Sequence, residues 1–272
     1  MRGTRALPTL DLVDTGDHVC WLVDQGEDFM SAARAFLADG ALFGDKVLVI
    51  GSAETRWLDR GTTQGLYLDP ETERGSRAGW GTQAVLAAVR READAAGREG
   101  FRALRVLAQA DRMWPTGASP QSVARYELDL DSLVADTGTL VVCAYHRASF
   151  SQATLEVAVG VHPHQAGRQS QVPDFRMFSV GTDCWSVSGV VDTDGAAAFR
   201  TAMSHLLASS ATVRLRCQDL QLMDAAAMEA LALCARALPG RKIVLEGANP
   251  TVRRCWTLLG FDAAQVPVEL AP

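Results

Sequence analysis

Short apolar runs alternate with longer amphipathic stretches along the first two-thirds of the chain. The apolar runs predict strands, and they cover residues 18–23, 46–50, 101–109 and 139–145. The amphipathic stretches place apolar residues at helical spacing, and they cover residues 27–42, 83–96, 119–136 and 152–159. After the second strand, the pattern allows only a short helix over 52–60 and at most one strand over 66–68. Because strand and helix alternate, the pattern predicts an α/β domain with a mainly parallel sheet.

A polar segment over residues 167–173 separates this series from a second, shorter one. In the second series the predicted strands cover residues 185–190, 213–217 and 242–245, and the predicted helices cover 194–208, 225–238 and 250–259. Asn249 followed by Pro250 is a strong start for the last of these helices, as Ser119 followed by Pro120 is for a helix in the first series. We place the boundary at about residue 180, which gives two domains, residues 1–180 and residues 181–272.

The stretch 213–238 has a clear local pattern. Val213, Leu215 and Cys217 alternate with polar residues, as in a half-buried strand, and Asp224 is a good N-cap for the helix that follows. This strand, turn and helix resemble the core of a STAS domain, the module of anti-sigma factor antagonists. The second domain is therefore expected to be a small STAS-type α/β domain.

The turn before this helix differs from the STAS pattern in one chemical respect. In STAS domains the turn reads Asp-Ser-Ser-Gly, and one serine is a phosphorylation switch; here the residues are Asp224, Ala225, Ala226 and Ala227, followed by Met228. The resemblance implies that these five residues dock with a regulatory protein, such as an anti-sigma factor or a kinase-like switch protein. Because the hydroxyls are missing, a phosphate on this turn could not block docking. The alternative is that Asp224 only caps the helix.

Residues 17–164 resemble another family, the MEDS sensory domain named from methanogen and methylotroph regulators. The resemblance lies in short segments spread along the domain, which are Asp17-His18-Val19-Cys20, residues 101–106, Tyr126-Glu127, residues 143–150 and His162-Pro163. It implies a RecA-like α/β core that senses small hydrocarbon-derived ligands. With the STAS-like tail, it implies a ligand-responsive input domain joined to an interaction output domain.

Polar residues in apolar surroundings mark a candidate ligand site in the first domain. Glu127 lies within the apolar stripe of its predicted helix, where an unpaired carboxylate is costly. His18 and Cys20 are two residues apart on a strand and share a face. Tyr145 and His146 end another strand, and ligands gather beyond the carboxyl ends of such strands. The alternatives are structural: a salt bridge for Glu127, a backbone hydrogen bond for His18 and a core thiol for Cys20.

His162 and Trp114 are further candidates for ligand contact. His162 and His164 could bind a metal ion, but the nearest cysteines and carboxylates lie far away in the sequence, so no metal site is predicted. Trp114 lies in a loop with Met113 and could form an apolar lid, with plain loop packing as the alternative. The sequence names no cofactor.

Composition narrows the classes of function. The chain has 272 residues and a net charge of −6, and acidic residues outnumber basic ones in both predicted domains, so we expect no nucleic-acid partner. No run of about 18 apolar residues occurs and the first residues lack the apolar segment of a signal peptide, so we expect no membrane association. The six cysteines form no C-x-x-C pair, which favours reduced thiols in a cytoplasmic protein.

Motifs for bond-making chemistry are absent from the sequence. The loop after Ile50 lacks the lysine of a phosphate-binding loop, and there is no dinucleotide fingerprint, nucleophile elbow or zinc-protease motif. The sequence therefore favours a non-enzymatic regulatory protein. Two alternatives stay open: an enzyme for small molecules or nucleotides, with the STAS-like part used for assembly, and a purely structural member of a signalling complex. Self-association also stays open.

Overall fold

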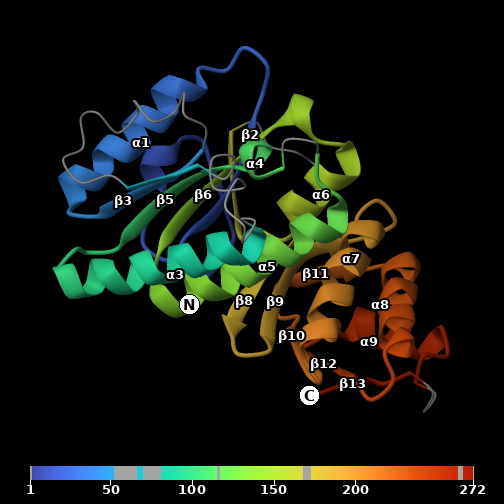
Figure 1. Cartoon of the computed structure of the whole chain (residues 1–272). Helices are drawn as coiled ribbons and strands as arrows, with labels where there is room; N and C mark the ends of the chain where they lie inside the picture. Colours follow the sequence, from blue (N-terminus) through green and yellow to red (C-terminus); the bar gives the residue numbers. More distant parts are fainter. Residues whose placement is uncertain are drawn as a thin grey trace.

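The structure, a computed structural model, describes residues 2–51, 66–69, 81–114, 117–167, 173–262 and 266–271. The chain forms two β-sheets with helices packed against them; the first runs from blue to green in Figure 1 and the second from yellow to red. The predicted helix over 52–60 lies outside the described residues, as do residues 168–172 of the predicted linker.

The first sheet contains seven described strands, all parallel, in the order β1-β7-β2-β6-β5-β3-β4. They are β1 (Arg5–Leu7), β2 (His18–Val23), β3 (Lys46–Ile50), β4 (Leu66–Leu68), β5 (Leu104–Gln109), β6 (Leu140–His146) and β7 (His164–Gly167). Every residue of β2 and β3 is buried, because helices cover both faces of the sheet. The predicted parallel α/β fold of the first domain is thus confirmed.

Helix α1 covers one face of this sheet, and α3, α5 and α6 cover the other (Figure 1). The helices are α1 (Phe29–Phe43), α3 (Thr82–Glu99), α4 (Ala110–Met113), α5 (Pro120–Thr137) and α6 (Gln152–Gly160), with single 3-10 turns at Leu10–Leu12 and Arg147–Ser149. Helix α5 begins as predicted, since the Ser119 side chain accepts a hydrogen bond from the backbone N–H of Ser122 at 3.1 Å. It ends at Gly138, which has a left-handed φ of 70°.

The second sheet is smaller and mixed. Its described strands are β8 (Phe175–Gly181), β9 (Cys184–Val191), β10 (Thr212–Arg216), β11 (Leu220–Met223), β12 (Lys242–Glu246) and β13 (Val268–Leu270). Strand β9 pairs in parallel with both β10 and β11, and β8 runs antiparallel to β9. The accompanying helices are α7 (Ala196–Ser209), α8 (Ala225–Ala237) and α9 (Pro250–Leu258). This arrangement confirms the second, smaller α/β domain.

The two sheets share one continuous apolar core. Helix α5 packs against β8 and α7, and α6 also packs against α7. The Phe175 ring of β8 meets Phe199 of α7 edge-on at 5.8 Å, and it fills the space beside Gly160. Strand β8 joins the second sheet although most of it precedes residue 180; the predicted domain boundary at about residue 180 stays a prediction.

Short strands account for most of the elements that the sequence pattern missed. Strands β1, β7, β11 and β13 have three or four residues each, too few to show a hydrophobic period. None of the helices in the described part of the chain combines the length and apolar character needed to cross a membrane.

Candidate functional site

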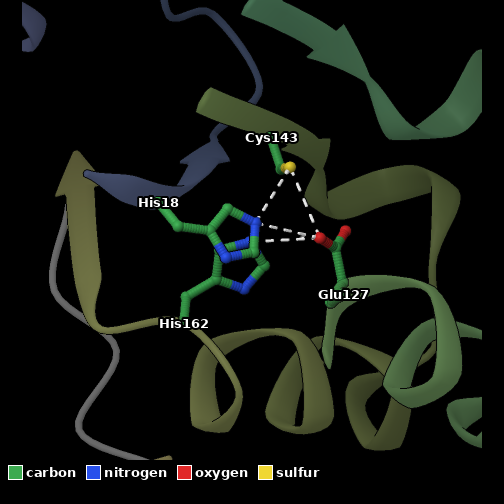
Figure 2. Close-up of side chains that lie close together, drawn as sticks. All are labelled: His18, Glu127, Cys143 and His162. Atoms are coloured by element: carbon green, nitrogen blue, oxygen red, sulfur yellow. Dashed lines mark hydrogen bonds and ion pairs between the residues drawn. The ribbon is translucent and has the colours of Figure 1, made fainter. Parts of the chain in front are cut away.

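Four polar side chains meet in the interior of the first domain (Figure 2). We call His18, Glu127, Cys143 and His162 the buried cluster. His18 begins β2, Cys143 lies in β6, Glu127 lies in the middle of α5, and His162 follows α6. One nitrogen, oxygen or sulfur atom from each of them lies within 4.8 Å of the others. Residues up to 144 positions apart in the sequence are therefore brought together by the topology of the sheet.

Glu127 is completely buried, and its neighbours compensate its charge. Its Oε2 atom lies 3.2 Å from Nε2 of His18 and accepts a hydrogen bond from the Cys143 thiol at 3.4 Å. Its Oε1 atom accepts a hydrogen bond from the Tyr145 hydroxyl. The predicted position of Glu127 in the apolar stripe of α5 is what the structure shows.

Asp131, one turn after Glu127 on α5, orients His18 from the other side. Its Oδ1 atom lies 3.1 Å from Nδ1 of His18, and its Oδ2 atom accepts the backbone N–H of Ser179 at 2.6 Å. The Arg2 guanidinium pairs with both carboxylate oxygens, at 2.6 and 2.9 Å. Asp131 and Arg2 were not among the predicted residues, although the i, i+4 spacing of Glu127 and Asp131 places both on one face of a helix.

His162 has one satisfied ring nitrogen and one unsatisfied one. Its Nδ1 atom lies 2.6 Å from the carbonyl oxygen of Ala158, so Nδ1 must carry the proton and donate it. Its Nε2 atom lies 3.4 Å from Oε2 of Glu127 but has no hydrogen-bond partner among the described residues. Its ring lies against that of His18, with 4.0 Å between the centroids.

Burial and charge pairing set the protonation of these groups. Burial would raise the pKa of Glu127, but the hydrogen bond and charge of His18 and the hydrogen bond of Tyr145 lower it below its usual range. Burial would likewise raise the pKa of Asp131, but His18 and Arg2 lower it to about 2. Burial opposes the charged form of His18, yet its contacts with Asp131 and Glu127 raise its pKa. Burial and the nearby His18 lower the pKa of His162 to about 3. Both carboxylates are therefore ionised at neutral pH, and His162 is neutral.

The structure places the other predicted ligand residues in different surroundings. Cys20 is buried opposite Cys143 in the register of β2 and β6, and burial, followed by the charge of Glu127, raises its thiol pKa. His146 follows Tyr145 but lies away from the cluster, with its Nδ1 atom 2.9 Å from Oδ1 of Asp111. Trp114 packs edge-on against the neighbouring Tyr126 at 5.5 Å. Of the seven predicted residues, His18, Glu127 and His162 belong to the cluster, and Tyr145 hydrogen-bonds to it.

A separate apolar pocket of about 350 Å³ opens on the other face of the sheet. It lies at the carboxyl ends of β1 and β7, where open α/β sheets bind ligands, and helix α1 forms one wall. Among its lining residues are Leu10, Trp21, Ala35, Phe36 and Gly167. The pocket could not be predicted from the sequence, because a pocket of this kind is defined by surface shape.

At the turn before α8, the structure confirms that Asp224 caps the helix. Its Oδ1 atom accepts the backbone N–H of Ala227 at 2.9 Å, and its Oδ2 atom accepts the hydroxyl of Thr193 at 3.0 Å. Ala225 is exposed and Ala226 half-buried, whereas Ala227 and Met228 are fully buried in the core. A surface for a partner can therefore include Asp224, Ala225 and Ala226 but not the last two predicted residues. Leu222, 40% exposed, is an apolar neighbour that the sequence analysis did not single out.

The chain thus combines a parallel α/β domain that holds a buried polar cluster with a small mixed α/β domain. Residues 17–163 match the family model described as the methanogen/methylotroph, DcmR sensory domain (MEDS). This match covers more than half of the chain, and the chain therefore belongs to the MEDS family. Residues 181–270 match a model described as the Mlab, STAS domain. No curated protein matches the chain.

The two matches confirm the resemblances and their order along the chain. Both families are sensory or regulatory rather than catalytic, and STAS domains generally mediate interactions between proteins. The chain thus has a regulatory or signalling character.

Proposed function

We propose that this protein is a non-enzymatic switch in which the MEDS domain binds a small apolar ligand and the STAS domain docks with a regulatory protein. The partner would be an anti-sigma factor or a related kinase-like protein, and the outcome would be regulation of transcription. The docking surface would consist of Asp224, Ala225 and Ala226 with the exposed Leu222 beside them.

The observation that carries this proposal is a set of contacts at Asp131 that connects the two domains; we call it the Asp131 joint. One carboxylate contacts His18 of the buried cluster through Oδ1 and the backbone of Ser179 in β8 through Oδ2. Strand β8 pairs with β9, whose last residue, Val191, accepts the backbone N–H of Asp224. A rearrangement in the cluster would therefore reach the docking turn through two strands of one sheet. These contacts support coupling between the two domains. Coupling itself requires two conformational states whose equilibrium both sites shift.

The pocket beside Trp21 supports the ligand part of the proposal. Its volume of about 350 Å³ suits a small molecule, and its walls are mostly apolar. Trp21 lies on β2, three residues after His18, so one strand carries both the wall of the pocket and a member of the cluster. The predicted contacts of His18, Cys20, Glu127, Tyr145 and His162 would then respond to the ligand from the opposite face of the sheet.

Filling the pocket tests ligand binding. The substitution Ala35→Trp would fill it from α1, whereas Ala38→Trp places the same ring on an exposed position of α1 that does not line the pocket. Isothermal titration with a panel of small hydrocarbon derivatives should show binding to the wild type and to Ala38→Trp, and about tenfold weaker binding to Ala35→Trp. Equal binding by both variants would rule out this pocket.

A charge at the docking turn tests the output. The substitution Ala225→Glu adds a carboxylate at the start of α8, where the helix dipole tolerates it, and Ala87→Glu adds the same charge on an exposed position of α3. Capture from native extract, read by mass spectrometry, should recover a regulatory protein with the wild type and Ala87→Glu. We expect recovery to fall about tenfold with Ala225→Glu, through charge repulsion and desolvation. Equal recovery with all three proteins would remove the turn from the interface.

A further inference from the structure

The geometry of the buried cluster assigns it a bound metal ion. We propose that His18, Glu127, Cys143 and His162 hold one four-coordinate transition-metal ion, with Zn²⁺ the best fit to two imidazoles, one carboxylate and one thiolate. This inference deepens the proposed function and rests on it, because the same cluster transmits the signal there.

Four of the six distances between the ligand atoms are close to those of a tetrahedral site. Bonds of about 2.0 Å to nitrogen or oxygen and about 2.3 Å to sulfur place ligand atoms about 3.3 to 3.6 Å apart at tetrahedral angles. Oε2 of Glu127 lies 3.2 Å from Nε2 of His18, 3.4 Å from Nε2 of His162 and 3.4 Å from Sγ of Cys143. Sγ of Cys143 lies 3.6 Å from Nε2 of His18. Binding of the ion would have to move the His18 and His162 rings apart, since their centroids are 4.0 Å apart.

The unsatisfied nitrogen of His162 distinguishes a metal site from a network of hydrogen bonds. Its Nδ1 atom donates to Ala158, so Nε2 presents a lone pair. This nitrogen lies 3.4 Å from a carboxylate oxygen, without a hydrogen bond, inside the protein. Two electron-rich atoms this close in a buried site repel unless a cation binds them. A metal ion bound by both atoms removes this repulsion and satisfies the buried nitrogen.

The groups behind the ligands are those that metal sites use. Metal-binding histidines generally donate their second ring nitrogen to a carboxylate or a backbone carbonyl. His18 contacts Asp131 through Nδ1 at 3.1 Å, and His162 contacts the Ala158 carbonyl. The ligating carboxylate of Glu127 is itself held by the Tyr145 hydroxyl. Every ligand except the thiolate thus has a partner that fixes its orientation.

Binding requires the release of two protons, because ligand atoms must be unprotonated. One leaves Nε2 of His18, and the other leaves the thiol of Cys143. With four protein ligands, all buried, the site would be closed, which is the form of structural rather than hydrolytic zinc sites. The ion would tie β2, α5, β6 and the segment after α6 together, directly behind the Asp131 joint.

Metal analysis of the full chain tests this assignment. The protein, purified without a histidine tag and dialysed against Zn²⁺ and then buffer, is analysed by mass spectrometry for first-row transition metals. We expect about one metal ion per chain, and at least about tenfold less in Cys143→Ser and in His162→Ala. The matched controls are Cys20→Ser, a buried thiol on the adjacent strand, and His164→Ala, a buried histidine two residues from the ligand. Both controls should keep the ion.

Two results would overturn the site: a wild type without stoichiometric metal, or equal loss of metal in Cys20→Ser and Cys143→Ser. If the Cys143 variant does not fold, the absorption spectrum of Co²⁺ bound to the wild type tests the site instead. A tetrahedral Co²⁺ spectrum with a thiolate charge-transfer band supports the site, and its absence refutes it. Metal content does not depend on a partner or an organic ligand. A chain that holds its ion but fails the docking and pocket experiments would therefore refute the proposed function alone.

Discussion

Asp224 illustrates how one side chain can serve stability and recognition at the same time. Its carboxylate caps α8 through the backbone N–H of Ala227, and it also accepts the hydroxyl of Thr193. The substitution Asp224→Ala removes the cap and should lower the free energy of unfolding by about 1 kcal/mol. The substitution Asp224→Asn keeps a capping oxygen and removes the charge, so it should lower the free energy of unfolding by only about a few tenths of a kcal/mol.

Urea denaturation of both variants measures this difference, and partner capture separates the two roles. If charge is recognised, Asp224→Asn should lose partner binding while it keeps stability. Equal destabilisation by both variants would show that the capping oxygen, which Asn retains, does not contribute to stability.

At this scale the sequence predicted part of the site. The position of Glu127 in an apolar stripe and the resemblance at His18, Tyr145 and His162 pointed to residues that the fold brings together. Cys143 lies in a segment that carries the MEDS resemblance, residues 143–150, but was not predicted to belong to the site. Arg2 and Asp131 could not be paired from the sequence, because 129 positions separate them and only the docking of the first residues against α5 brings them into contact.

Strand β9 is the element on which the second sheet depends, since it pairs with β8 on one edge and with β10 and β11 on the other. Gly189 lies where the pairing passes from β10 to β11, and it has a left-handed φ of 82°. A Cβ atom there would lie 2.2 Å from the carbonyl oxygen of Asp174, the residue before β8. Only glycine accommodates both the conformation and this close approach.

Gly189→Ala should therefore destabilise the protein by about 2 kcal/mol or more. Gly97→Ala is the matched control: Gly97 is exposed in α3, and an added Cβ would meet no atom within 4 Å. That control should stabilise the protein by up to about 1 kcal/mol, because alanine favours the helix. Thermal unfolding followed by circular dichroism compares the two, and unchanged stability of Gly189→Ala would contradict the account of β9.

At the scale of elements, periodicity predicted the long helices and the central strands well. Helix α5 and strand β3 agree with the predicted spans to within a residue at each end. The strands that the pattern missed are mostly edge strands, and their pairing depends on contacts distant in sequence, as for Arg5 opposite His164. Local pattern carries no information about such partners.

The whole molecule is held together by an apolar core that does not stop at the junction of the two domains. Phe199 of α7 is completely buried in it and meets Phe175 of β8, while α7 itself packs on α5 and α6. Phe199→Ala should cost about 3–5 kcal/mol through the cavity it leaves. Because the core is shared, the loss should loosen both sheets.

Hydrogen exchange measured by mass spectrometry tests this. Amide exchange should accelerate in β5 and β6 of the first sheet as well as in β9 and β10 of the second. Leu258→Ala, at a position 74% exposed, is the control and should change neither. Acceleration confined to residues 175–271 would mean that the two domains unfold independently. It would also favour a boundary before β8, and limited proteolysis could then locate it against the predicted position near residue 180.

The alanines of the turn before α8 affect how long a response can last. A serine at this position would let an output module keep a covalent record of a past stimulus until a phosphatase erased it. Ala225 and Ala226 offer no oxygen for such a mark. Under the proposed function, no covalent modification of the turn would outlast the stimulus, and the response would decay as fast as the bound ligand dissociates.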